Sequence, residues 1–475
     1  MRRCSLLFSA LSGCLLYAGC LVQDPAWEPP AETDGLPPTD GPQSSSEGTS
    51  AVSSETGANT DGATGAVPGD ELPIDCLPLP DIPADAIIVS PADNPSLDTV
   101  FSEAAPNTTI ALEPGTYDRA GQPALVLSAD GVTVRSTTGD PDDVVLTGGS
   151  SETAALVSVQ ASDVLLAEFT IQDSSEVLVE IGVEDVVLQR PRIYRMVLRD
   201  SLRTKLSVGN GVARWTDDGE VACSTFARSD TFRENLTDCG GASALRISGG
   251  ARWSVRDNLI EGHWCSTFSF ATLAVDRGSR DTVVERNILR NNFRGILLGG
   301  DNIDAGRPEP ADDTCGVPDG PSWGHIRGVV VNNLTWVDDP AMAGAIPGLG
   351  TDLDSMLGLW HACGAVAVHN TSYVTLTTFN GIEWRYPDTT ATIANNLVST
   401  ELASRNGALA LGVDTNVIGV DASEFIDAAG GDFRLAASST AIDAGIVIPA
   451  VLVPEDFNRN KRTDQPDLGA FETQP

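Results

Sequence analysis

The alternation of hydrophobic and polar positions along the chain predicts many short β-strands separated by turns. The clearest unit is residues 279–300, where Val283 and Ile288 stand among polar neighbours and an apolar run follows at 296–298. Asparagine residues lie between these apolar positions, and asparagine tolerates the left-handed backbone region and bonds its own backbone in turns. A unit this short cannot bury its own apolar face, so the pattern predicts that similar units stack on it.

The same unit recurs along the chain. Its core is an apolar residue, two spacers and then an asparagine, and the asparagines are Asn258, Asn287, Asn333, Asn370 and Asn396. The shortest interval between successive members indicates one coil of about 25 residues, within the range typical of solenoids. The longer intervals then contain loop insertions. For each of these asparagines the simplest role is to cap a turn.

These repeats resemble the right-handed parallel β-helix family, the pectin-lyase-like superfamily, over residues 84–472. The resemblance implies an all-β protein with a single right-handed parallel β-helix solenoid, in which the recurring asparagines form a ladder. Residues 96–105 are expected to form an amphipathic helix with Leu97, Val100 and Phe101 on one face, which resembles the family's N-terminal helical cap. The superfamily includes lyases, hydrolases, adhesins and inert binders, so it predicts the fold and leaves the activity open.

The start of the chain predicts export. Arg2 and Arg3 precede a mostly apolar stretch at 6–17, which is typical of a secretory signal and too short for a membrane span. This stretch ends in a segment that resembles a bacterial lipobox, with Cys20 as the lipidated residue. Cys14 fits the lipobox letters slightly better but leaves a very short apolar stretch. Because Leu21 is not the aspartate that favours inner-membrane retention, we expect an exported protein with a lipid anchor in the outer membrane.

The composition divides the chain into three parts. We expect a signal peptide at residues 1–19 and a β-helix domain at 76–475. Residues 20–75 between them are rich in Pro, Gly, Ser and acidic residues and contain little apolar material. Such a segment cannot offset the entropy of ordering, so we expect a disordered tether.

The net charge of −37 disfavours nucleic acid as a partner. We expect a monomer that meets a polysaccharide and reaches the membrane only through its lipid. One basic run interrupts the acidic background, and it is either a surface for anionic sugars or a mixed strand region with solvated charges. Its members are Arg190, Arg192, Arg195, Arg199, Arg203 and Lys205.

Six cysteines remain after the leader, and an even number in an exported protein predicts disulfides. The connectivity cannot be derived from the sequence. Our predicted pairs are Cys223 with Cys239, which bracket one polar loop, and Cys315 with Cys363, which would tie a long insertion to the next coil. By elimination this leaves Cys76 with Cys265. The absence of C-x-x-C spacing argues against a cysteine metal site.

Candidate chemistry follows from what each activity on this fold would need. Hydrolysis would need paired inward aspartates near a Gly-His-Gly segment, and the chain contains no such segment. A lyase would need a base and cations that neutralise a uronate carboxylate. The candidates for these roles are Arg277, Arg280, Arg294, Arg385, Glu285 and Glu383, with His263 and His361 as bases and Trp264, Trp360 and Trp384 for stacking on sugars. The alternative is loop packing for the tryptophans and a cross-strand ion pair for Glu383 and Arg385.

The C-terminal region contains spacing loosely like a calcium loop. Asp456, Asn458, Asn460 and Asp467 would supply ligands, but Lys461 stands where glycine is expected, so a rigid polar end-cap is the competing interpretation.

Two functions remain open from the sequence. The first is a surface-anchored protein that acts on extracellular or envelope polysaccharide as a uronate lyase. The second is a non-catalytic carbohydrate-binding or adhesive solenoid.

Overall fold

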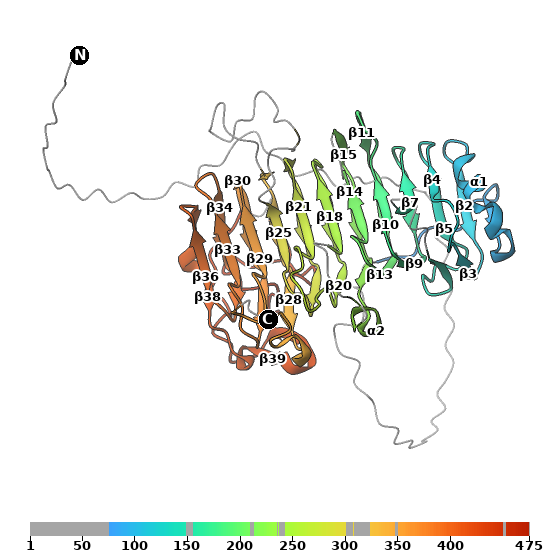
Figure 1. Cartoon of the computed structure of the whole chain (residues 1–475). Coiled ribbons are helices and arrows are strands. Elements are labelled where there is room, and N and C mark those ends of the chain that lie inside the picture. The colour runs from blue at the N-terminus through green and yellow to red at the C-terminus, as the bar shows by residue number, and fades with distance from the viewer. Residues whose placement is uncertain are drawn as a thin grey trace, which may run out of the picture. The chain divides into compact units, whose positions relative to one another are not determined.

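The computed structural model describes residues 76–148, 155–209, 213–234, 236, 243–300, 307, 324–346, 350–449 and 453–474. These residues form a right-handed parallel β-helix, as predicted (Figure 1). The predicted signal peptide, the lipidation site Cys20 and the predicted tether all lie outside the described residues. No helix among the described residues is long and apolar enough to cross a bilayer.

Three long parallel sheets, here called A, B and C, run along the solenoid, and each coil contributes a strand to each in turn. Sheet A contains β1 (Ile87–Val89), β2 (Thr109–Leu112), β5 (Thr133–Ser136), β8 (Leu165–Ala167), β12 (Arg192–Tyr194), β16 (Glu220–Ala222), β19 (Ser254–Arg256), β23 (Val283–Glu285), β27 (Val329–Val331), β31 (Ala365–Val368), β34 (Thr390–Ala394) and β37 (Leu409–Leu411).

Sheet B contains β3 (Gly115–Asp118), β6 (Val144–Thr147), β9 (Thr170–Ser174), β13 (Val197–Ser201), β17 (Thr225–Ala227), β20 (Leu259–Glu261), β24 (Ile288–Arg290), β28 (Leu334–Val337), β32 (Thr371–Val374), β35 (Leu397–Val398) and β38 (Val417–Ile418). Sheet C contains β4 (Leu125–Leu127), β7 (Ala155–Val159), β10 (Val177–Ile181), β14 (Leu206–Val208), β18 (Leu245–Ser248), β21 (Leu273–Asp276), β25 (Ile296–Gly299), β29 (Leu357–Trp360), β33 (Ile382–Arg385) and β36 (Leu402–Arg405).

Smaller elements lie at the corners and ends of the stack. Parallel pairs form from β11 (Val186–Gln189) with β15 (Arg214–Asp217), and from β22 (Ser279–Arg280) with β26 (His325–Ile326) and β30 (Ala362–Cys363); β39 (Phe425–Asp427) and β40 (Asp432–Leu435) are antiparallel. The helices are α1 (Leu97–Ser102) and α2 (Asp230–Glu234), with 3-10 turns η1 (Pro91–Ser96), η2 (Pro340–Met342), η3 (Val413–Thr415), η4 (Ala422–Glu424) and η5 (Ala428–Gly430).

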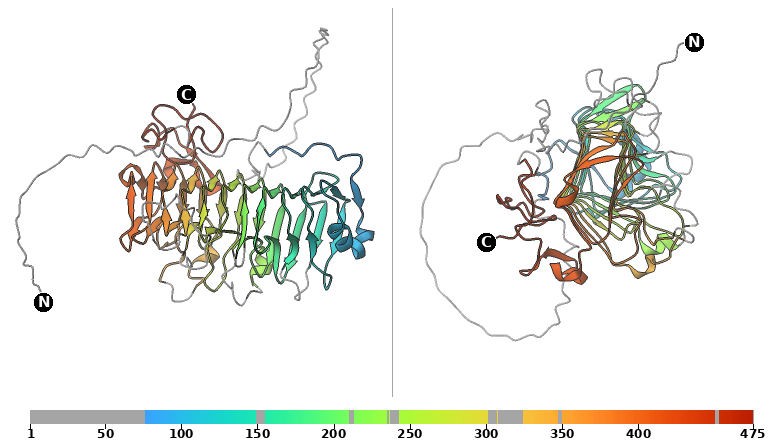
Figure 2. Two further views of the ribbon diagram at one scale, coloured as in Figure 1. Left: turned by 90° about the horizontal axis from the view of Figure 1, so that it is seen from above. Right: turned by 90° about the vertical axis from the view of Figure 1, so that its left-hand side faces the viewer.

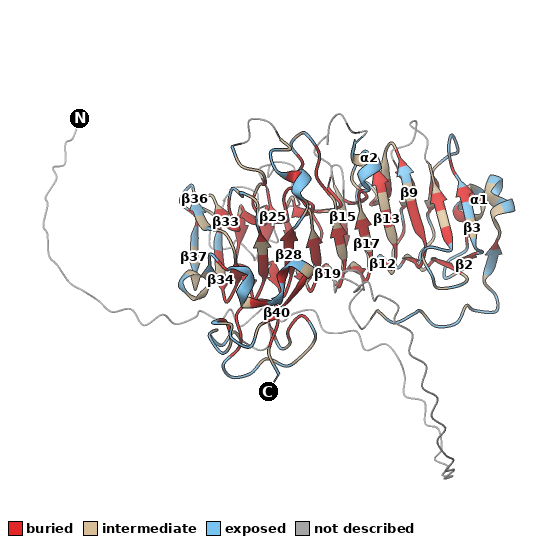
Figure 3. Ribbon diagram, turned by 90° about the horizontal axis from the view of Figure 1, so that it is seen from below, coloured by how far each residue is buried: buried red, intermediate tan, exposed pale blue. Residues whose placement is uncertain are grey.

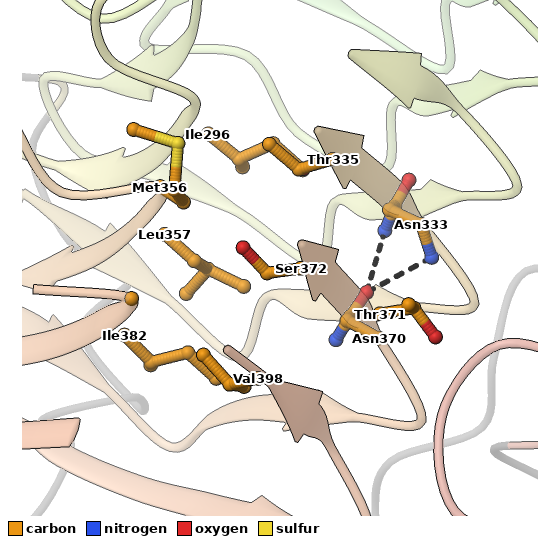
Figure 4. A pocket seen from close by; sticks show the side chains of 11 residues that line it. Ile296, Asn333, Thr335, Met356, Leu357, Asn370, Thr371, Ser372, Ile382 and Val398 are labelled. Carbon is orange, nitrogen blue, oxygen red and sulfur yellow. Dashed lines mark hydrogen bonds between the residues drawn. The ribbon is translucent and has the colours of Figure 1, made fainter. Parts of the chain in front are cut away.

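The predicted asparagine ladder is present and fixes the coil register. Val255 pairs with Val284, and Asn258 donates from Nδ2 to Oδ1 of Asn287 at 2.9 Å. The described ladder continues to Asn416 beyond the five predicted members, each accepting from the residue below it. Figure 4 shows Asn333 and Asn370 bonded in this way at the edge of an interior void of about 10 Å³. Such a void has room for about one water and cannot hold a sugar.

The core is a continuous column of apolar side chains. The end-on view in Figure 2 (right) shows the sheets that surround the interior of the solenoid. The predicted cap forms as the short helix α1, whose Leu97 and Phe101 are buried against the first coil. At the other end the terminal strands are more exposed, with Leu409 and Leu411 about two-thirds accessible (66% and 65%). Figure 3 shows this contrast between the buried middle of the stack and its exposed ends.

The C-terminal segment does not cap the last coil. Its apolar residues, including Phe425, Phe433 and Phe471, pack with Leu334 and Trp336 beside sheet B (Figure 1). The segment therefore stabilises the side of the solenoid, which corrects the expectation of an end-cap.

The disulfide prediction was wrong for two pairs. Cys76 is bonded to Cys223 across 147 residues of sequence, so Cys223 is not paired with Cys239 and Cys76 is not paired with Cys265. Cys265 and Cys363 are also disulfide-bonded, whereas Cys239 and Cys315 lie outside the described residues. The bond at Cys76 holds the first described residues against sheet A, where they pack with Ala167, Tyr194 and Ala222.

Residues 76–80 also close over a buried carboxylate. Glu168 is fully buried and accepts from Arg135 at 2.7 Å and from the backbone of Leu79 at 3.0 Å. Arg195 donates to the carbonyl of Cys76 at 2.6 Å. This network explains why Cys76 reaches Cys223: several polar contacts guide the segment across the coils that separate them.

Candidate functional site

The two-residue period of a strand divides β29 and β33 into inward and outward sides. Leu357, Leu359, Ile382 and Trp384 belong to the apolar core. Trp360, Glu383 and Arg385 therefore point outward. We call the outer side of β25, β29, β33 and β36 the sheet C face; its polar and aromatic members are Arg294, Trp360, His361, Glu383, Arg385, Tyr386, Asp388 and Arg405.

Two arginines lie near the Trp360 ring. The guanidinium carbon of Arg385 is 4.4 Å from the Trp360 ring centre, and that of Arg294 is 5.0 Å from it. The indole folds over Gly358, where a Cβ would stand 3.3 Å from the indole nitrogen. Guanidinium groups near an indole gain cation–π attraction, which grows when the pair is desolvated.

Most charges on the sheet C face are already satisfied. Glu383 is fully buried and accepts from the Trp360 indole at 2.8 Å and from Arg405 at 3.0 Å, while Arg294 forms an ion pair with Asp354.

Arg385 differs from its neighbours. Its closest acid is Glu383 at 3.9 Å, and its guanidinium donates no hydrogen bond to any residue in the part of the chain that the structure describes. A planar guanidinium held in place with unused donors suits bidentate recognition of a carboxylate.

A histidine and an aspartate lie beside this arginine. His361 follows β29 in the left-handed region (φ 49°), and its Nδ1 is 2.7 Å from Oδ2 of Asp388. The imidazole stacks on Tyr386, with ring centres 4.0 Å apart and planes 8° apart. Because a carboxylate only accepts, Nδ1 carries the proton and Nε2 is the basic nitrogen of the neutral ring. Asp388 and Tyr386 thus fix the tautomer and the orientation of a candidate general base.

The sequence-predicted residues are only partly brought together. Arg294, Glu383, Arg385, Trp360 and His361 meet on the sheet C face. Arg277 follows β21, whereas His361 follows β29. The strand register places the coil that contains β25 and Gly300 between these two residues, so Arg277 lies further along the solenoid.

Other predicted residues lie elsewhere. Glu285 is on sheet A, and Arg280 lies on β22, where burial and then the charge of Arg307 lower its pKa. His263 is buried at a turn after sheet B and is not available as a base. Burial holds the pKa of His263 well below its usual value.

The predicted sugar-stacking tryptophans are not accessible. Trp264, Trp360 and Trp384 are only 8%, 5% and 6% exposed, and Trp384 points into the core. Among the described residues near the sheet C face, the most accessible rings are those of Phe268 and Phe379, at 47% and 45% exposure. This is a correction, because a sugar needs an open ring face and the tryptophans present none.

The basic run does not form one surface. Arg190 pairs with Asp163 at 2.6 Å, Arg192 with Glu220 at 2.8 Å, and Arg199 with the Gln172 amide at 2.5 Å. Arg195 and Arg203 approach Glu168 and Glu176. These residues lie on two sheets and at the corners between them, so the solvated, paired interpretation fits the structure better than an anionic-sugar surface.

Lys205 is fully buried, near Asp200, Arg228 and His263. Burial first, and then the charge of Arg228, hold its pKa well below the usual value, while Asp200 acts in the opposite sense. In the unfolded chain the amine titrates at about pH 10.4. Between the two pKa values the unfolded state therefore binds one more proton than the folded state, and stability rises with pH.

Replacing Lys205 with methionine is expected to raise the free energy of unfolding near neutral pH, because it removes a buried amine whose charged form is disfavoured by burial. The variant should also lack a slope of about 1.4 kcal/mol per pH unit that this lysine contributes. Urea unfolding of both proteins at a series of pH values below about pH 10.4, the unfolded-state pKa of lysine, measures the slope. Parallel pH profiles for the two proteins would contradict a neutral buried lysine.

The calcium-like residues are engaged by the backbone. Asp456 accepts from the amides of Asn460 at 2.7 Å and Glu472 at 2.8 Å, and Asp467 accepts from the amide of Asp443 at 2.8 Å. Asn458 is exposed. Across the described ranges no group of three or more His, Cys, Asp or Glu side chains is arranged to hold a metal. Hydrogen bonds therefore hold this segment, and the carboxylates of Asp456 and Asp467 are already engaged by backbone amides.

Sequence reasoning missed Asp388, Tyr386 and Arg405. Tyr386 is the residue immediately after β33. Because Trp360 pairs with Arg385, the next residues along the two strands, His361 and Tyr386, are expected to be neighbours. Asp388 and Arg405 had no such signal, because they reach the face from a corner and from the next coil. A separate and larger hollow of about 330 Å³ lies beside α2 and is lined by Asp173, Asp200 and Phe232 among others.

The fold defines this chain as a right-handed parallel β-helix protein. No protein-family model and no curated protein sequence matches it. Among solved structures it is similar to pectate lyase Pel9A, with a TM-score of 0.52, 15% identity, and 83% of this chain and 98% of that chain covered.

Two further similarities are weaker. An alginate lyase from Paenibacillus sp. strain FPU-7 has a TM-score of 0.35 and 13% identity, covering 70% of this chain and 98% of that one. The A-module of a mannuronan C-5 epimerase from Azotobacter vinelandii has a TM-score of 0.36 and 11% identity, covering 69% and 93%. At these identities the likeness establishes the fold alone.

Proposed function

We propose that this protein binds a uronate-containing polysaccharide on the sheet C face and cleaves it by β-elimination. The observation that carries the proposal is Arg385, whose guanidinium lies over Trp360 with unused donors and stands next to the His361–Asp388 pair. A carboxylate receptor beside an oriented base is the combination that abstraction of a proton next to a carboxylate requires. The pectate lyase with the same fold acts on a substrate of this class, which adds fold-level support.

The proposed reaction uses groups of this chain. Arg385 pairs with the uronate carboxylate and stabilises the negative charge that develops on it. Nε2 of His361 removes the proton from the carbon next to the carboxylate, while Asp388 stabilises the imidazolium that forms. The electron pair becomes a carbon–carbon double bond, and the bond to the glycosidic oxygen breaks. Water returns a proton to that oxygen, and the imidazolium of His361 gives its proton to the hydroxide that remains, which restores the neutral base. The products are a new chain end and an unsaturated uronate.

Binding can be measured separately from cleavage. The His361→Gln variant should retain affinity for a uronate polymer such as polygalacturonate or alginate, and adding Arg385→Ala to it should weaken that affinity by at least about tenfold, as expected for loss of a charge-assisted pair. A neutral polymer such as dextran should not bind. Equal affinity for neutral and uronate polymers, or no effect of Arg385→Ala, would sink the proposal.

A non-catalytic carbohydrate-binding solenoid is the second candidate. It is favoured by the neutralised charges of Arg294 and Arg405, which pair with Asp354 and Glu383 and so add little net attraction for an anionic chain. Binding of a neutral or a uronate polymer without formation of an unsaturated product would favour this candidate over the lyase.

We further propose that the protein is exported and anchored by a lipid on Cys20, because an apolar stretch and small residues precede this cysteine. Mass spectrometry of the mature N-terminus should find an acylated Cys20, and Cys20→Ser should release the protein from the membrane fraction. An unmodified N-terminus at another residue would contradict the anchor.

A further inference from the structure

Two phenylalanines on loops that lead into sheet C stay open to solvent. Phe268 precedes β21 and is 47% exposed, and Phe379 precedes β33 and is 45% exposed. A large apolar side chain left this accessible loses the benefit of burial, so an exposed aromatic next to a binding face is a candidate contact residue.

Both rings are held in place from one side. The guanidinium carbon of Arg294 is 5.0 Å from the centre of Phe268, and that of Arg405 is 4.4 Å from the centre of Phe379. Phe268 also packs edge-on against the buried Phe293, with ring centres 5.6 Å apart. The two arginines are fixed in turn by Asp354 and Glu383. The phenylalanines are therefore positioned before any ligand arrives, which reduces the entropy lost on binding.

The two rings lie at the same edge of sheet C on different coils. Three strand steps separate β21 from β33, through β25 and β29, which corresponds to about 14 Å along the solenoid. The coils between them carry Arg294 and Trp360. A chain that runs along the solenoid axis and contacts both rings must pass this part of the sheet C face.

We infer that Phe268 and Phe379 are stacking platforms for two sugar rings of one polysaccharide chain, several units apart, that crosses sheet C along the axis of the β-helix. This inference rests on the proposed function. The open face of each phenylalanine packs against the apolar face of a sugar ring, while the arginine behind it faces the other side. Because a disaccharide is shorter than the distance between the platforms, only longer oligomers engage both.

Binding of defined oligouronates tests this inference. The probes are a disaccharide and a hexasaccharide of galacturonate, and the full chain carrying His361→Gln serves as background so that ligand is not consumed. Phe268→Ala and Phe379→Ala should each weaken hexasaccharide binding by about three- to tenfold, and the double variant should combine both losses. Phe→Tyr at either position keeps the ring and should retain affinity. Leu411→Ala, which removes an exposed apolar group from sheet A, is the matched control and should change nothing.

The outcomes separate the two claims. If Arg385→Ala weakens hexasaccharide binding while both phenylalanine variants bind like their parent, the platforms are wrong and the proposed function stands. If each phenylalanine variant weakens the disaccharide as much as the hexasaccharide, the rings do not contact separate units and the inference is also wrong. If the parent binds neither the galacturonate oligomers nor the corresponding oligomers of alginate, the proposed function fails and the platforms fail with it.

Discussion

Val284→Asp is expected to prevent stable folding of the central coils. Val284 is fully buried in the core column, between Val255 of one coil and Val330 of the next. An aspartate there would place a carboxylate among apolar rungs with no partner, which costs several kcal/mol or forces the acid to stay protonated. Loss of the cooperative unfolding transition, or a decrease of about 4 kcal/mol or more in the free energy of unfolding, is the expected result by urea titration.

Asn287, the ladder residue three positions after Val284, provides a milder test of how this coil is packed. The Asn287 side chain donates to Asn333, Val255 and Glu285 and accepts twice from Asn258. Asn287→Ala leaves several of these buried groups unpaired, each at about 1 to 3 kcal/mol.

The matched control is Glu285→Ala on the outer side of the same strand, where the glutamate pairs with Arg286. Its loss should cost well under about 1 kcal/mol. If Glu285→Ala destabilised the protein as much as Asn287→Ala, the inward and outward sides of this strand would be assigned wrongly.

His361→Gln and Arg385→Ala are expected to have the largest effects on activity. Removing a positioned general base lowers kcat by about 10² to 10⁴, and glutamine keeps the size of the side chain without its basicity. Arg385→Ala should lower kcat/KM strongly, because the arginine holds the carboxylate both in the substrate and in the transition state. Initial rates over a range of polymer concentrations separate the two effects.

The positioning role of Asp388 has its own signature. Asp388→Asn should reduce kcat by perturbing the imidazole tautomer and should shift the pH profile of kcat/KM, while leaving polymer affinity near that of the parent. Arg192→Ala, which removes a paired arginine from the outer side of sheet A, is the control for general loss of charge. A similar loss of rate in Arg192→Ala and Arg385→Ala would show that the sheet C face is not the site.

The fold could be predicted because its repeats are local. Each asparagine stands three residues after an inward apolar residue, so the ladder and the core are encoded within a few positions of each other. A second repeat was missed: Asp163, Arg190, Asp218, Arg252, Asp281 and Arg327 each lie two residues before a sheet A strand, all with left-handed backbone. Neighbours in this column form ion pairs of 2.6 to 2.7 Å, including Arg252 with Asp218. The alternation of aspartate and arginine at one coil position could have predicted this column of ion pairs from the sequence.

The site could be predicted only in part, for geometrical reasons. The alternation within β33 was enough to place Glu383 and Arg385 on one side and Trp384 on the other, so the burial of Trp384 was accessible to sequence reasoning. The partnership of His361 with Asp388 was not, because it depends on how a corner turns between coils. The disulfide between Cys76 and Cys223 was also beyond reach, since proximity in sequence is no guide when a segment crosses several coils.

The central claim is a uronate lyase on the sheet C face, and formation of unsaturated product tests it most directly. The purified protein would be incubated with a panel of uronate polysaccharides while ultraviolet absorbance follows the new carbon–carbon double bond. We expect absorbance to rise with at least one polymer, and the rise to disappear in His361→Gln and in Arg385→Ala but not in Arg192→Ala. No rise with any polymer, or an undiminished rise in the His361 and Arg385 variants, would contradict it.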